Sequence, residues 1–154
     1  MISTGASKVS YLPERPNIAR RLLIEPNSFA WQDAAVARLE ELVRLEKGWD
    51  GYSASPVSLA NAAFALQMLE VICGVDSAPP QIVPGFEGDL QIEWHTLKGD
   101  VELHVKAPND VHAWRFDCEG GAEEELDLRN DFLVAAQWVN EVSEHPIAFA
   151  AAAA

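Results

Sequence analysis

The sequence predicts an α+β fold in which two N-terminal helices and one C-terminal helix pack on one face of a four-stranded antiparallel meander. The hydrophobic period changes from about 3.6 residues to 2 after Ala78-Pro79-Pro80. Short turn segments then follow one another at the spacing of hairpins. The length of 154 residues suits one domain with its own core.

Three segments are expected along the chain. Residues 1–28 are an extended N-terminal arm, residues 29–145 a single α+β domain, and residues 146–154 an alanine-rich tail. The arm contains three prolines, which fix φ and remove backbone donors. The alternative within it is a short helical turn around Ile18–Ile24, where apolar residues fall near helical spacing.

Apolar residues recur at helical spacing over 30–47 and 56–73, the two predicted N-terminal helices. Gly48 suits the end of the first, because glycine takes the left-handed conformation without a Cβ penalty. Ser55 is the expected N-cap of the second helix, with Pro56 at its first position.

The four predicted strands cover 81–84, 89–97, 100–107 and 111–118. Two-residue turns at Lys98-Gly99 and Asn109-Asp110 would place the large apolar side chains on one face, which a slip of one residue would reverse. These turns pair Trp94 with Leu103, Ile92 with Val105, Leu103 with Phe116 and Val105 with Trp114. The expected inner face is lined by Trp94, Leu103, Val105, Trp114 and Phe116.

The C-terminal part begins with an acidic link, in which a short fifth strand over 123–127 is left open. Asp127 is the expected N-cap of the last helix over 128–143. Apolar residues in that helix step by four and three along one face.

The charge of the chain is strongly negative and unevenly divided. The net charge is −13, and residues 1–28 carry four basic and two acidic residues. The acidic body repels nucleic acid, so direct binding of nucleic acid by it is not expected, and it attracts basic proteins. The alternative is that the charge serves solubility alone. The acidic residues expected to bind a basic protein partner are Glu40, Glu41, Glu123, Glu124 and Glu125.

The segment Gly48-Trp49-Asp50-Gly51-Tyr52 is the most distinctive local sequence. It fits a connector in which Trp49 fills a gap and the Asp-Gly pair forms the turn. It also fits a recognition loop with Trp49 and Tyr52 as anchors for a partner.

The predicted register places Glu93, His104 and Arg115 in one row of the outer sheet face, and His95, Glu102 and Asp117 in the next. One interpretation is a polar face held by complementary cross-strand pairs. The alternative is a small metal-dependent hydrolase or nuclease. Its ligands would be Glu93, His95, Glu102 and His104.

Other chemical signals are absent from the sequence. It contains no nucleophile, phosphate-loop or zinc motif, so a non-catalytic protein without a cofactor is favoured. Cys73 and Cys118 are expected to be buried apolar residues. The N-terminus has no signal-peptide core, and no apolar stretch is long enough for a membrane span, so a cytoplasmic location is expected.

The pattern G-W-D-G-x-x-A-x-P, then P-x-[IV]-x-P, then G-x-[IL]-x-[IL]-E-W, over about 39–107, resembles a set of small bacterial proteins. The resemblance carries no assigned activity. It implies a setting beside mobile or toxin-like genes. With the charge, this favours a non-catalytic interaction module, such as an antitoxin, an immunity protein or a subunit of a defence system. The third alternative is a structural subunit of a larger assembly.

Overall fold

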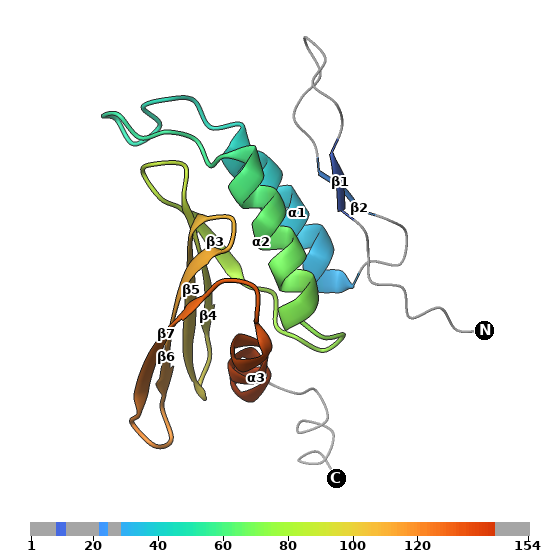
Figure 1. The fold of residues 1–154 in the computed structure, drawn as a ribbon, viewed down its shortest axis with the longest axis vertical. Helices are drawn as coiled ribbons and strands as arrows, with labels where there is room; N and C mark the ends of the chain where they lie inside the picture. Colours follow the sequence, from blue (N-terminus) through green and yellow to red (C-terminus); the bar gives the residue numbers. More distant parts are fainter. Residues whose placement is uncertain (1–8, 12–21, 25–28, 144–154) are drawn as a thin grey trace, which may run out of the picture.

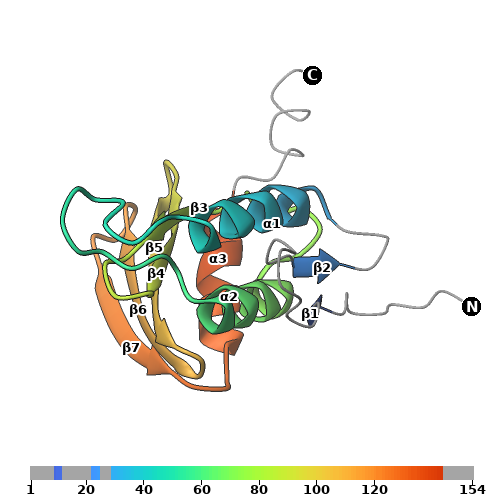
Figure 2. The ribbon, with the colours of Figure 1, turned by 90° about the horizontal axis from the view of Figure 1, so that it is seen from above.

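Residues 9–11, 22–24 and 29–143 are described by the computed structural model, in which three helices lie on one face of a five-stranded antiparallel sheet (Figures 1 and 2). The helices are α1 (Ala30–Val43), α2 (Leu59–Ile72) and α3 (Leu133–Val142). The strands of the sheet are β3 (Gln81–Pro84), β4 (Leu90–His95), β5 (Gly99–Ala107), β6 (Asp110–Asp117) and β7 (Glu123–Leu128). Their order in the sheet follows the chain, which confirms the predicted α+β class and meander with one strand more than predicted.

Two short strands lie within the predicted N-terminal arm. β1 (Val9–Tyr11) pairs antiparallel with β2 (Leu22–Ile24), and β1 contacts α2. Figure 2 shows this pair on the opposite side of the helices from the sheet. The rest of the predicted arm and the tail predicted over 146–154 lie outside the described residues.

Helix α2 begins later than predicted. Its N-cap is Ser58, whose Oγ accepts a hydrogen bond from the Asn61 N–H at 3.1 Å. Ser55, the predicted cap, instead forms a parallel bridge with Glu87. That bridge holds the following Pro56 in the connector, outside the helix. Helix α1 also ends earlier than predicted, at Val43.

The acidic link after β6 forms the fifth strand that the sequence raised as a possibility over 123–127, and this strand extends to Leu128, where the last helix was predicted to begin. Asp127, the predicted cap, lies inside β7, where it pairs with His112 of β6. Helix α3 starts only at Leu133, whose N–H donates to Asp131 Oδ1 at 3.1 Å. The acidic residues therefore belong to an edge strand of the sheet, and the helix is shorter than predicted.

The turn between β4 and β5 lies one residue earlier than predicted. Thr96 and Gly99 exchange two backbone hydrogen bonds, of 3.0 and 3.3 Å. Trp94 consequently pairs with Val101 rather than with Leu103. Because this shift is by two residues, the side chains keep the faces that were predicted.

The predicted register between β5 and β6 is wrong by an odd number of residues. Leu103 pairs with Ala113 rather than with Phe116, and a β-bulge interrupts the ladder near the end of β5. An odd offset exchanges the two faces of a strand. Ala113 is therefore fully buried under the helices, whereas Trp114 and Phe116 lie half-buried on the outer face.

Arg115 fastens α3 to the sheet. Its Nε lies 2.6 Å from Glu124 Oε2 on β7, and its Nη1 lies 2.5 Å from Glu141 Oε2 on α3. The guanidinium also stands 5.2 Å from the ring centroid of Trp138. This position was predicted to belong to the outer face, and the odd register shift places it on the helix side instead.

Candidate functional site

The 48–56 loop between α1 and α2 is built by local hydrogen bonds. Gly48 has φ of +82°, a conformation that glycine adopts without steric cost. Asp50 Oδ1 accepts backbone N–H bonds from Tyr52 at 2.9 Å and from Ala54 at 3.1 Å. These bonds lower the pKa of the Asp50 carboxyl, against an opposing effect of desolvation.

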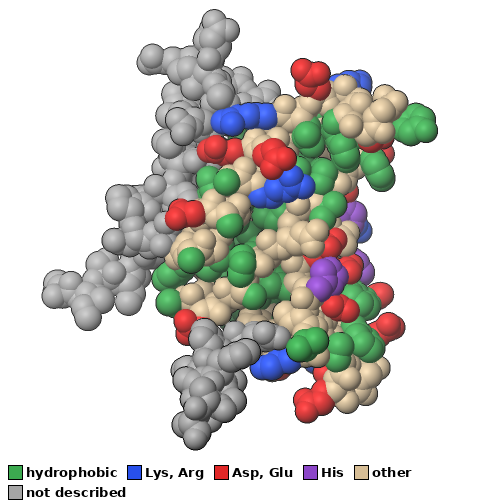
Figure 3. All heavy atoms as spheres, turned by 180° about the vertical axis from the view of Figure 1, so that it is seen from behind, with side chains coloured by type: hydrophobic (Ala, Val, Ile, Leu, Met, Phe, Trp, Pro, Cys, Tyr) green, Lys and Arg blue, Asp and Glu red, His purple; other side chains and the backbone are tan. Residues whose placement is uncertain are grey.

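The loop displays aromatic side chains at one end of the molecule. The Trp49 indole N–H donates to the Ser55 carbonyl at 3.0 Å, and its ring stacks on Phe86 with centroids 6.2 Å apart. Trp49 thus helps to hold the loop, whereas Tyr52 is 90% exposed. Figure 3 shows hydrophobic side chains projecting at this end.

The outer face of the sheet is not covered by any described helix or strand (Figure 2). Trp114 and Phe116 of β6 lie half-buried on this face. Each aromatic side chain is flanked on the neighbouring strands by two carboxylates, Glu102 and Glu125 beside Trp114 and Asp100 and Glu123 beside Phe116. We call these six residues the outer-face cluster.

His95 joins this face to the end of β4. Its Nε2 lies 3.0 Å from Glu93 Oε2, and its Nδ1 lies 2.9 Å from Asp100 Oδ1. Both hydrogen bonds favour the imidazolium form and raise the pKa of His95. Figure 3 shows histidine and acidic side chains gathered along this side of the molecule.

The remaining members of the predicted metal set lie in other pairs. His104 Nε2 is 2.6 Å from Asp89 Oδ2, and Glu102 accepts a hydrogen bond from Gln91 Nε2 at 3.0 Å. Within the described part of the chain, no group of three or more His, Cys, Asp or Glu side chains is arranged to hold a metal ion. The structure therefore brings Glu93 and His95 together, but not the four predicted ligands.

The ion pairs of His95 predict a pH-dependent contribution to stability. Because the folded pKa is raised above the usual 6.5, the stabilisation is fully present below that value and is lost as the pH rises through the folded pKa. The difference in unfolding free energy between the wild type and His95→Gln should shrink from about pH 5 to about pH 8. Urea denaturation at several pH values measures it, and a constant difference would contradict the expectation.

The acidic residues predicted to bind a partner differ in their surroundings. Glu40 Oε2 lies 3.6 Å from Arg44, and Glu41 Oε1 lies 3.0 Å from Arg38, so α1 balances part of its own charge. Glu124 is bound by Arg115 as described above. Glu123 and Glu125, two members of the outer-face cluster, are exposed on the outer side of β7, and Glu125 Oε2 lies 4.0 Å from His112 Nε2.

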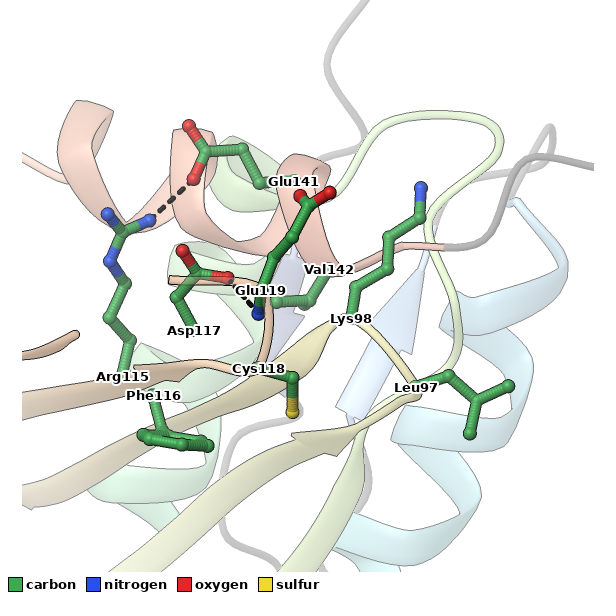
Figure 4. Close-up of a pocket in the computed structure, with 9 residues that line it drawn as sticks. All are labelled: Leu97, Lys98, Arg115, Phe116, Asp117, Cys118, Glu119, Glu141 and Val142. Carbon is green, nitrogen blue, oxygen red and sulfur yellow. Dashed lines mark hydrogen bonds and ion pairs between the residues drawn. The ribbon is translucent and has the colours of Figure 1, made fainter. Parts of the chain in front are cut away.

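A pocket of about 560 Å³ opens at the end of the sheet, where two turns meet the end of α3 (Figure 4). Arg115 within it is held by Glu141, and Asp117 accepts backbone N–H bonds from Glu119 and Gly120. The pocket therefore carries charges of both signs, and Lys98 Nζ also lies 3.5 Å from the Ser143 carbonyl. The lining residues are Leu97, Lys98, Arg115, Phe116, Asp117, Cys118, Glu119, Glu141 and Val142.

The two cysteines have different environments, although both were predicted to be buried. Cys73 is buried, and desolvation raises the pKa of its thiol to about 12 despite a hydrogen bond with Ser77. Cys118 is exposed, because it lies in the turn after β6 that the register shift moves away from the core. Neither forms a disulfide.

The fold and the site together define an α+β protein whose helices cover one sheet face and whose other face presents aromatic rings among carboxylates. No protein-family model, curated protein or solved structure matches the chain. Across the described residues, every helix is too short or too polar to cross a membrane.

Proposed function

We propose that this protein is a non-catalytic interaction module that binds a basic protein partner through the outer-face cluster. The observation that carries the proposal is the position of Trp114 and Phe116, half-buried between carboxylates on a sheet face that no described element covers. Aromatic side chains supply most of the binding energy in many interfaces. Surrounding carboxylates attract a basic partner from a distance and exclude acidic ones.

The polar pairs on this face support binding rather than catalysis. His95, His104 and His112 each lie within 3.0 Å of a carboxylate oxygen. Such pairs orient side chains across the strands and stabilise a preorganised surface. A substrate would need a concave site with converging groups, whereas a protein partner needs only an exposed complementary face.

The biological role that we propose is that of an antitoxin, an immunity protein or a subunit of a defence system. The charge of the chain supports it, because 24 acidic residues stand against 11 basic ones. A small acidic protein of this kind can neutralise a basic partner by covering its charged surface. The resemblance to small bacterial proteins with the G-W-D-G pattern points in the same direction.

The test is affinity purification of the full chain from its native host, followed by mass spectrometry. The wild type should recover one basic protein in stoichiometric amount, and added salt should release it. The double variant Trp114→Ala/Phe116→Ala should lower the recovery at least about tenfold, because two central aromatic anchors are lost.

The matched control is Phe86→Ala, which removes an aromatic side chain that is 67% exposed at a distant loop. This variant should recover the partner as the wild type does. Recovery of the wild-type protein alone, as a monomer, would refute the proposal. Equal losses of partner recovery in the double variant and in Phe86→Ala would show that the outer-face cluster is not the binding surface.

A further inference from the structure

The sheet ends in two edge strands, and one of them, β3, is closed to further pairing. The Gly85 N–H donates to the Asp89 carbonyl at 2.9 Å, so the odd-numbered residues of β3 bond to β4 and the even-numbered ones face outward. Arg38 Nε donates to the outward carbonyl of Ile82 at 3.0 Å. Pro84, the other outward residue, has no N–H to donate.

The opposite edge strand, β7, is open. The Asp117 N–H donates to the Ala122 carbonyl at 2.9 Å, so the even-numbered residues of β7 bond to β6. Glu123, Glu125 and Asp127 therefore direct their backbone N–H and C=O groups to the free edge. Among the described residues, none forms a backbone hydrogen bond with these groups.

The side chains along β7 determine which strand could be added. Glu123, Glu125 and Asp127 all lie on the outer face, in register with Phe116, Trp114 and His112. A strand added to this edge would therefore meet a row of carboxylates on that face. Opposite charges placed directly across two strands stabilise the pairing, whereas like charges oppose it.

Two other occupants of the edge are disfavoured. A second copy of β7 would place carboxylates against carboxylates. The β1–β2 pair of the same chain lies beyond the helices, on the side of the molecule away from β7 (Figure 2). An extended segment of a different, basic protein remains the occupant that the charge selects.

We infer that β7 accepts an extended basic segment of the partner as an antiparallel sixth strand of the sheet. The inference rests on the proposed function and adds to it the mode of recognition. Backbone hydrogen bonds to Glu123, Glu125 and Asp127 supply affinity, and alternate lysine or arginine side chains on the outer face supply specificity. The added strand extends the surface that carries Trp114 and Phe116.

The probe is a fluorescent peptide of about eight residues in which lysine and valine alternate, titrated into the full chain at low salt. In an antiparallel pair, residues directly opposite one another place their side chains on the same face of the sheet. When one of them points its backbone N–H and C=O groups at the other strand, the opposite residue does the same. Lysines opposite the carboxylates therefore direct their backbone N–H groups at β7. Backbone N-methylation of the lysines should weaken binding at least about tenfold, with the charge unchanged.

N-methylation of the valines is the matched control, because their N–H groups point away from β7. This peptide should bind within about twofold of the parent peptide. Equal binding of both methylated peptides would overturn strand addition and leave binding by charge alone, with the proposed function intact. Selective loss on valine methylation would overturn the antiparallel arrangement, and no binding by the parent peptide would overturn the inference as a whole.

Protein variants test the same edge from the other side. Glu125→Pro removes an outward N–H that takes no part in the ladder to β6, and proline is tolerated at such positions. It should weaken binding of the parent peptide at least about tenfold, whereas Glu125→Gln should weaken it only about threefold. Equal effects of the two substitutions would contradict strand addition. Far-UV circular dichroism checks that both variants are folded, and the methylated peptides decide the question if the proline variant is not.

Discussion

The Ala113→Lys variant should be unfolded or nearly so, whereas Trp114→Lys, at the next residue, should be folded. Ala113 is fully buried opposite Leu103, beneath the helices. An ammonium group in that position has no partner, and a buried charge without a partner costs about 3–5 kcal/mol. The four-carbon stem adds overpacking of about 1–3 kcal/mol. Together these costs reach a large part of the stability of a typical domain.

The Trp114→Lys variant is the matched control, because it places the same side chain on the opposite face of β6. There the ammonium lies between Glu102 and Glu125 on the neighbouring strands. Each cross-strand pair stabilises by roughly 0.2–1 kcal/mol, which offsets part of the lost burial of the indole. Urea denaturation compares the two, and a larger loss at position 114 would mean that the faces of β6 are reversed.

A substitution of Gly99 by alanine should destabilise the fold by about 3 kcal/mol. A Cβ atom at this position would overlap the carbonyl oxygen of Phe116 and would lie 3.4 Å from Val142 Cγ1. The carbonyl belongs to the backbone of β6, so it cannot move away as the end of a flexible side chain could. The β5–β6 pair and the end of α3 would both have to shift.

The control for this substitution is Gly74→Ala, in the connector after α2. A Cβ atom there has its nearest neighbour, Ser77 Oγ, at 4.0 Å, so no group has to move. The change in unfolding free energy should stay within about 0.5 kcal/mol. Thermal or urea unfolding measures both variants, and equal stabilities would show that β5 and β6 are not packed as closely at Gly99 as described.

The α+β class, the three helices and four of the five strands follow from hydrophobic periodicity, but the faces of β6 do not. Trp114 and Phe116 are large apolar residues, so their size favours the inner face, and the register that puts them there is the wrong one. The observed turn is Pro108-Asn109, in which Asn109 adopts φ of +60°, and proline followed by asparagine is a sequence signal for such a turn. The β-bulge near the end of β5 leaves no comparable mark in the sequence.

The candidate site was predicted only in part, for a related reason. The acidic residues at 123–125 could be found from charge, and the outer-face positions of His95 and His104 from alternation, whereas the same register error that misplaced Trp114 also put His112 on the inner face. The partners of these side chains depend on the register of the strands. Glu93 and His104, predicted in one row, therefore lie in separate pairs: Glu93 with His95, and His104 with Asp89. The closure of β3 depends on Arg38, which reaches Ile82 across 44 residues of chain. Local patterns contain no information about such a contact.

Each strand of the sheet pairs with the next strand along the chain, and this order affects how fast the sheet can fold. All four pairings close through short turns, so each hairpin costs little loop-closure entropy. Sheets with such local contacts fold faster than those that join distant segments. We expect the five strands to form as successive hairpins in chain order, with the docking of α3 through Arg115 as a late step.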